Sequence, residues 1–257
     1  TSQAVSVGVN LTVEGSTTGL AAGATLAASA STLMAPAFLN SAGGAGGVQP
    51  WWATALAQDF EGSTTGLAAG ATLTRSAVDA NAAATGIAGG GGDDLILNTG
   101  TIATQSRNVQ DPRNVQANAT TVSVGIEPTV VTKTGAAIGA ALTDTRATSN
   151  ATAIGIDGGD GDDKVVNRGD ITLATIGSDT TAVGVALELA LAKQGFTASA
   201  ALARADATST ATVAGIAGGV GDDTLVNEKQ VTLKNVKSDS NAVSVSLDIS
   251  GAQDGLV

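Results

Sequence analysis

The sequence predicts an all-β protein, an elongated β-solenoid (β-helix) built from repeats of about 60 residues. A Gly-Asp turn is written three times at nearly constant spacing, which is typical of stacked repeats. Long stretches alternate strictly between two kinds of side chain, which is the period of a β-strand. The composition, with 34 Gly, 2% aromatic residues and abundant Ala and Val, suits a thin interior better than the thick interior of a sandwich.

The Gly-Asp turns occupy residues 89–94, 158–163 and 218–223. Each is followed by a short apolar strand that ends in Asn, at Asn98, Asn167 and Asn227. Asn suits a turn because it tolerates the left-handed conformation and bonds to nearby backbone. The turns therefore mark equivalent points of successive units.

The clearest alternation lies between residues 183 and 191, which favours a strand over the helix that Ala-rich composition would otherwise suggest. One face carries Val183, Val185, Leu187, Leu189 and Leu191, and the other carries Gly184, Ala186, Glu188 and Ala190. We expect each unit to form three coils of about twenty residues, with Val, Ala and Leu buried inside. Antiparallel β-hairpin or sandwich repeats, turning at Lys193-Gln-Gly195, are the alternative.

The repeat divides the chain into four parts. Residues 1–118 form an irregular first repeat with an insertion at 27–60 and a surface loop at 107–116, residues 119–180 the second repeat, residues 181–240 the third, and residues 241–257 the start of a fourth, incomplete one. Residues 14–26 recur letter for letter as 61–73, through either a recent duplication or an error of sequence assignment. We expect the incomplete unit to belong to a longer array or to be completed by the next subunit.

Four of the five aromatic residues fall in or at the end of the expected insertion, at Phe38, Trp51, Trp52 and Phe60. Clustered aromatic side chains mark contact sites when they are exposed. We therefore expect an interface there, with a small satellite core or an end cap as the alternative.

Charge and composition exclude several classes of function. With 12 basic and 23 acidic residues the formal net charge is −11, which disfavours nucleic acid as a partner. No run of about 18 apolar residues occurs, so we do not expect a membrane-spanning helix. The chain has no His, Cys or Tyr and its acids fall in repeated turns, so we do not expect an enzyme.

Each Gly-Asp turn fits the pattern G-G-x-G-x-D-x-U-x and resembles the haemolysin-type calcium-binding repeats of secreted bacterial surface proteins and toxins. The resemblance implies calcium ligation by Asp94, Asp163 and Asp223, with Asp93, Asp162 and Asp222 beside them. Family members carry these nonapeptides in tandem, whereas here single copies lie about 60 residues apart. Three coils between turns would separate them by ~14 Å, too far to share an ion; tight-turn formation without calcium is the alternative.

The residues after the turn, such as 162–171, also resemble repeats of autotransporter-like adhesins. From the array of about 60 residues, the Gly-Asp turns and the incomplete fourth unit, we expect an extracellular or cell-surface structural or adhesive protein that self-associates head to tail as a fibre or filament subunit. The alternative is a calcium-dependent binding module of a larger secreted adhesin or surface-layer protein. Thr-rich strands also suggest ice binding, although regular outward Thr-x-Thr rows are missing.

Overall fold

The structure, a computed structural model, describes residues 2–4, 7–16, 19–38, 53–104 and 115–256, and the side chains of residues 66–104 and 115–254. Every element in these ranges is a β-strand. The strands are β1 (Ser2–Ala4), β2 (Val7–Ser16), β3 (Gly19–Phe38), β4 (Ala53–Gly91), β5 (Leu95–Asn98), β6 (Ile102–Ala103), β7 (Val115–Asp160), β8 (Lys164–Asn167), β9 (Ile171–Val220), β10 (Thr224–Asn227) and β11 (Val231–Leu256). The fold is thus all-β, and its long parallel strands are compatible with an elongated β-solenoid.

The strands pair in parallel and in the register of the sequence repeat. The main sheet has the order β11-β9-β7-β4-β2, and the short strands form a second sheet, β10-β8-β5. Val183 of β9 pairs with Val122 of β7 on one side and with Val243 of β11 on the other. The strand pairs of the described residues are all parallel, so the antiparallel hairpin alternative is wrong for this part of the chain.

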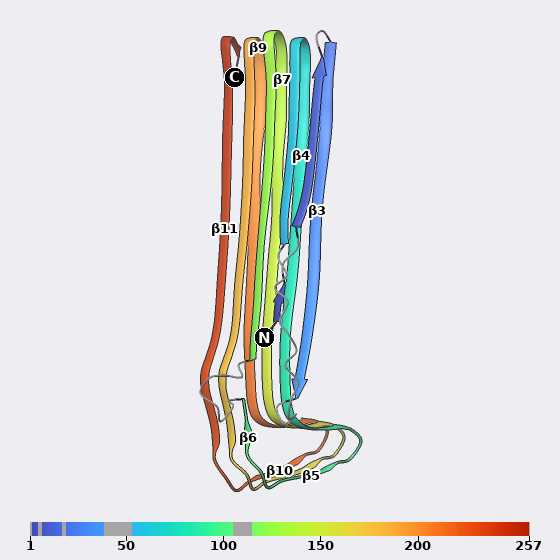
Figure 1. The fold of residues 1–257 in the computed structure, drawn as a ribbon, viewed down its shortest axis with the longest axis vertical. Coiled ribbons are helices and arrows are strands. Elements are labelled where there is room, and N and C mark those ends of the chain that lie inside the picture. Colours follow the sequence, from blue (N-terminus) through green and yellow to red (C-terminus); the bar gives the residue numbers. More distant parts are fainter. Residues whose placement is uncertain (1, 5–6, 17–18, 39–52, 105–114, 257) are drawn as a thin grey trace.

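Each unit makes one long coil rather than three short ones (Figure 1). We call the end of the molecule that carries the short strands β5, β8 and β10 the foot, and the opposite end the tip (Figure 1). The chain runs from the foot to the tip, reverses at a glycine of positive φ such as Gly135 or Gly195, and returns to the foot. We call the two halves of a long strand, before and after this glycine, its outgoing arm and its return arm. The expectation of three coils per unit is wrong, because Gly159 pairs directly with both Gly90 and Gly219. Consecutive Gly-Asp turns are therefore one strand spacing apart, ~4.8 Å.

Small side chains line the space between the two arms. Ala182, Ala186 and Ala190 of the β9 outgoing arm have no exposed surface. Hydroxyl groups join the arms across this space: Ser149 Oγ of β7 lies 2.6 Å from both Ser178 Oγ and Thr180 Oγ1 of β9. Val183, Val185, Leu187 and Leu189 alternate with these alanines and are partly exposed, so the expectation that this face would be buried inside is wrong.

Larger aliphatic side chains gather where the long strands meet the foot. Ile156, Ile171, Leu173 and Ile176 are fully buried there and belong to one hydrophobic cluster with Ile96 and Val165 of the short strands. Burial of each of these side chains stabilises the folded state by ~1.5–3 kcal/mol. The cluster therefore anchors the turns that follow β7 and β9.

The duplicated segments lie side by side in adjacent strands. Glu14 pairs with Glu61 and Leu26 with Leu73, so the identical residues stack in register. The pairing continues beyond the identity, from Ala27 with Thr74 to Phe38 with Thr85. The described parts of the expected insertion 27–60 therefore lie within β3 and β4. Residues 107–114 of the expected loop lie outside the described residues, and the remaining two begin β7.

Candidate functional site

The Gly-Asp turns bring the expected aspartates together in two rows along the stack. In the outer row, the backbone N–H of Asp162 donates to Asp93 Oδ1 at 2.9 Å, and the N–H of Asp222 donates to Asp162 Oδ1 at 2.9 Å. These side chains are at the surface. The carboxylates of Asp93 and Asp162 thus each accept a hydrogen bond from the backbone of the next turn, which stabilises the stacking of the turns.

The inner row donates in the opposite direction. The N–H of Asp94 bonds to Asp163 Oδ1 at 2.8 Å, and that of Asp163 to Asp223 Oδ1 at 3.0 Å. Asp163 is buried, and the Oδ2 atoms of Asp94 and Asp163 have no hydrogen-bond partner among the described groups. A Cβ added at Gly158 would lie 2.5 Å from Asp163 Oδ2, so this carboxylate fills the space that a side chain at Gly158 would need.

The aspartate rows fit calcium in ligand type but only partly in ligand number. Carboxylate oxygens suit a hard cation, which takes six to eight oxygen ligands. One carboxylate oxygen, Oδ1, of Asp93, Asp162, Asp163 and Asp223 already accepts a backbone hydrogen bond from a neighbouring turn. The Oδ2 atoms are therefore the ones that remain to bind a cation. Within the described ranges, no group of three or more His, Cys, Asp or Glu side chains is arranged to hold a metal ion. Neighbouring turns are nevertheless close enough to contribute to one site.

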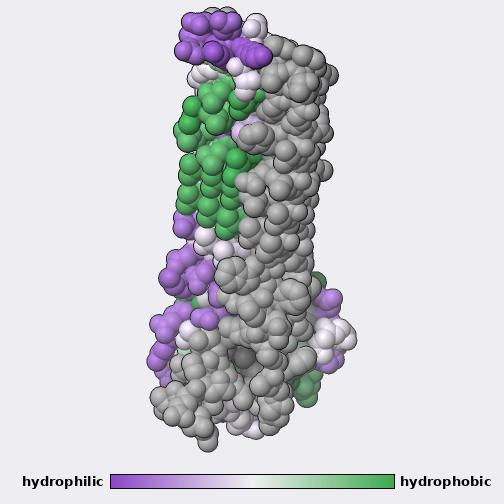
Figure 2. All heavy atoms as spheres, turned by 45° about the horizontal axis from the view of Figure 1, so that its top comes forward, coloured by the Kyte–Doolittle hydropathy of each residue, from purple (hydrophilic) through white to green (hydrophobic). Residues whose placement is uncertain are grey.

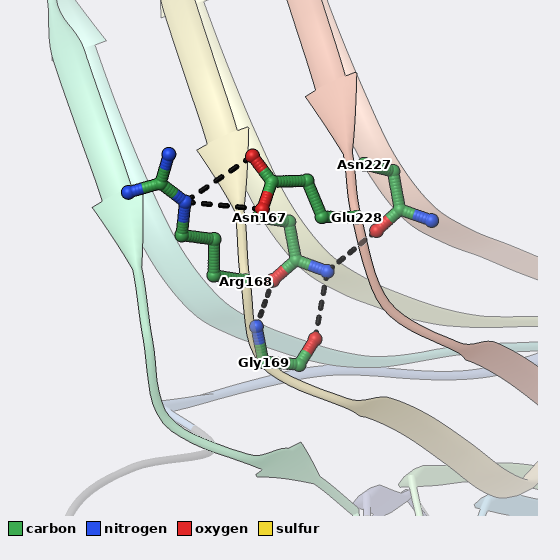
Figure 3. A network of polar contacts seen from close by, with 5 residues as sticks. All are labelled: Asn167, Arg168, Gly169, Asn227 and Glu228. Atoms are coloured by element: carbon green, nitrogen blue, oxygen red, sulfur yellow. Dashed lines mark hydrogen bonds and ion pairs between the residues drawn. The ribbon is translucent and has the colours of Figure 1, made fainter.

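A row of asparagines, buried at Asn98 and Asn167 and exposed at Asn227, follows the turns (Figure 3). Asn167 Nδ2 donates to Asn227 Oδ1 at 2.7 Å, and Asn98 Nδ2 donates to Asn167 Oδ1 at 2.6 Å. Asn167 also bonds its own turn, because its Nδ2 donates to Gly169 O and its Oδ1 accepts from Gly169 N. The hydrogen bond to nearby backbone that we expected of these asparagines is present. The left-handed conformation is not adopted at this row: among the described non-glycine residues, a positive φ occurs at Thr175 and Asn235.

An ion pair lies on the surface beside this row (Figure 3). Arg168 Nε is 3.2 Å from both carboxylate oxygens of Glu228 in the next unit. Both side chains are about half exposed, so the pair contributes only about 0–1 kcal/mol.

Besides the two aspartate rows of the turns, a third row of acids lies on the inward face of the outgoing arms, and the sequence analysis did not single it out. Glu188 pairs in register with Glu127 on β7 and with Asp248 on β11. Glu127 and Glu188 are buried, and Thr72 of the β4 return arm donates to Glu127 Oε2. Glu188 faces Gly139 of the β7 return arm, where an added Cβ would come within 1.9 Å of Oε1. An alignment of the three copies could have revealed this row, because Glu127, Glu188 and Asp248 occupy equivalent positions.

The surroundings of Glu188 make its ionisation unfavourable. Burial, followed by the negative charges of Glu127 and Asp248, raises the Glu188 pKa from 4.5 to about 8. Neither carboxylate oxygen of Glu188 has a hydrogen-bond partner among the described groups. Glu188 is therefore mostly protonated at neutral pH.

The outgoing arms carry apolar side chains on their outer surface, which we call the apolar face. Its residues form rows across β7, β9 and β11: Val122, Val124 and Ile126; Val183, Val185 and Leu187; Val243, Val245 and Leu247. On β11 these side chains are 40–49% exposed. Figure 2 shows a continuous hydrophobic area on the long arms, with hydrophilic residues at both of its ends.

The expected aromatic interface falls largely outside what the structure describes. Trp51 and Trp52 lie outside the described residues. Phe38 ends β3 and Phe60 lies in β4, but their side chains also lie outside the described set. The interface at these four residues stays a prediction.

The described part of the chain contains no helix with the length and hydropathy of a membrane span. Comparisons with protein-family models, curated proteins and solved structures found no match to this chain.

Proposed function

We propose that the protein is an extracellular structural or adhesive surface protein that self-associates into a fibre or filament. The observation that supports this most is the apolar face, because its Val and Leu rows point away from an interior filled by smaller side chains. Outward rows of this kind on a sheet are typical of protein contact surfaces. The resemblance of the Gly-Asp turns supports the extracellular location.

A second copy of this chain suits the apolar face. The rows repeat at the strand spacing of ~4.8 Å, so an identical face offers ridges with the same spacing. Sheets pack face to face about 10 Å apart, with side chains from the two faces interdigitating. Each Val or Leu removed from water contributes about 1.5–3 kcal/mol before the losses on association are subtracted.

Head-to-tail association is the other mode by which such a molecule extends. In the described strand order β11 lies at one end of the sheet, and an edge strand presents backbone groups to a further strand. Face-to-face contact depends on the outward side chains and edge pairing on the backbone, so substitutions on the apolar face separate the two modes.

The double substitution Val185→Thr and Leu187→Ser is expected to weaken self-association about tenfold or more, because it removes two apolar side chains from the centre of the face. Light scattering coupled to size-exclusion chromatography, over a range of concentrations, measures this. Leu225→Ser, at an exposed leucine of the foot, is the matched control and leaves association unchanged. A native chain that stays monomeric throughout, or a double variant that associates like the native chain, would contradict lateral association through this face.

A calcium-dependent binding module of a larger secreted adhesin is the second candidate function. Direct stacking of the turns favours it, because carboxylates of adjacent turns are ~4.8 Å apart rather than ~14 Å. When bound, calcium would neutralise the like charges of the rows. The Oδ2 atoms of Asp93, Asp162 and Asp222 on the outer row, together with turn carbonyls, would hold it.

Calcium titration followed by calorimetry tests this candidate. The native chain is expected to take up calcium saturably and to unfold at a higher temperature with it, because the ion binds the folded turns. Asp162→Asn with Asp222→Asn is expected to abolish both effects, while Asp179→Asn, an exposed acid of the outgoing arm, leaves them unchanged. Absence of uptake at millimolar calcium would remove the candidate.

A further inference from the structure

A groove of about 400 Å³ crosses the outer surface of three return arms, and its chemistry differs from the rest of this acidic chain. Its volume lies in the range of small-molecule sites. The groove is lined by Arg75, Ser76 and Ala77 of β4, Asp144 and Arg146 of β7, and Arg204 and Asp206 of β9.

Strand register places these charges in two adjacent rows. Arg75, Asp144 and Arg204 pair in one row, and Ala77, Arg146 and Asp206 pair in the other. Both aspartates are already engaged: Arg75 Nη2 lies 3.2 Å from Asp144 Oδ2, and Arg204 Nη2 lies 2.8 Å from Asp206 Oδ2.

The guanidinium of Arg146 belongs to neither of these ion pairs. It lies in the middle strand of the groove, and no described carboxylate forms an ion pair with it. On β4 the neighbouring position is Ala77, whose short side chain leaves space beside the guanidinium. A guanidinium with open donors in a hollow binds an oxyanion through paired N–H groups.

An apolar row borders the groove on the same outer face, two residues before the first charged row. Leu73, Leu142 and Leu202 pair in register and are 45%, 39% and 62% exposed. Ala71, Ala140 and Ala200 continue this surface toward the tip. Leu142 lies four residues from Arg146 on β7, ~13 Å along the strand, with Asp144 of the first charged row between them. A hydrocarbon chain that extends from a head at Arg146 therefore crosses this row before it contacts the leucines.

We propose that this groove binds a single-chain amphiphilic oxyanion: a carboxylate, sulfate or phosphate head at Arg146, with its hydrocarbon chain along the leucine row. Arg75 and Arg204 flank the head, but Asp144 and Asp206 balance their charges, so the net positive charge of the groove is that of Arg146. A free amphiphile rather than a bilayer is the occupant, because the hollow has the volume of a small molecule. This site is independent of the apolar face, which lies on the outgoing arms.

Isothermal titration with octyl phosphate, below its micelle concentration, and with inorganic phosphate tests the proposal. Octyl phosphate is expected to bind saturably and about tenfold or more tightly than inorganic phosphate, since the leucine row contacts only the former. Arg146→Gln is expected to weaken octyl phosphate binding about tenfold or more. Leu142→Ser is expected to remove most of the difference between the two ligands.

Arg168→Gln, at an exposed and ion-paired arginine away from the groove, is the matched control and leaves binding unchanged. Circular dichroism of each variant verifies that the strands are retained. No saturable binding of octyl phosphate, equal weakening by Arg168→Gln, or equal affinity for both phosphates would overturn the proposal. Binding to anionic vesicles without binding to octyl phosphate would overturn it as well and assign the surface to a bilayer.

Discussion

A Gly159→Ala substitution is expected to destabilise the protein by about 3 kcal/mol or more. Gly159 has a φ of +107°, which L side chains rarely adopt, and its added Cβ would lie 1.9 Å from the backbone oxygen of Gly90 in the adjacent turn. The obstacle is backbone, so no rotation of a side chain relieves it. The measurement is the free energy of unfolding by urea.

Gly90→Ala is the matched control. Gly90 has the same φ of +107°, but no described atom lies within 4 Å of its added Cβ. This variant therefore carries the conformational strain without the clash, about 1–2 kcal/mol. Equal destabilisation by the two substitutions would contradict the direct stacking of the Gly-Asp turns.

Replacing Glu188 by Gln is expected to stabilise the protein at pH 8 and to change its stability little at pH 5. The amide has the shape of the protonated acid and carries no charge, so it avoids the ionisation that burial and the neighbouring acids oppose. Thermal unfolding of both proteins across this pH range measures the difference.

The sign follows from the direction of the Glu188 pKa shift, from 4.5 up to about 8. Its contribution to stability is fully present below pH 4.5 and is lost as the pH rises through 8. Each pKa unit corresponds to ~1.4 kcal/mol. Because Asp248 at the end of the row is exposed to water, we expect a net effect of only about 1–3 kcal/mol.

Glu228→Gln is the control for this prediction, because Glu228 is an exposed acid paired with Arg168. Its effect on stability is expected to be small and nearly the same at pH 5 and pH 8. A Glu188→Gln variant with the same pH dependence as the native protein would show that the buried row is ionised or solvated in the folded state.

The repeat could be predicted from the sequence, whereas the inward face could not. Alternation between residues 183 and 191 identifies a strand, but a period of two leaves open which side faces inward. The larger side chains of Val185 and Leu187 were expected inside on hydrophobicity alone. The facing arms are so close that hydroxyl groups of Ser149 and Thr180 meet across the gap, which favours small side chains there. The long side chain of Glu188 fits because it faces Gly139.

The number of coils per unit could not be predicted from the sequence either. A spacing of about 60 residues gives the translation between equivalent positions, but not how often the chain winds within it. The hairpin alternative predicts a turn at Lys193-Gln-Gly195, and the two arms of β9 do meet there. These arms pair with neighbouring units instead of with each other. The stacking of Asp162 on Asp93 depends on this pairing between neighbouring units, so it could not be predicted from the sequence.

The in-register stack has a consequence for how the chain reaches its native state. Hydrogen-bonded partners such as Asn167 and Asn227 lie 60 residues apart, so almost nothing in the long strands is stabilised by near neighbours in sequence. Closing such large loops is entropically unfavourable and slow, as in other topologies of high contact order. Once one coil exists, however, its edge is a ready template for the next. We therefore expect growth by sequential addition of coils after a slow nucleation step, as in a one-dimensional polymer.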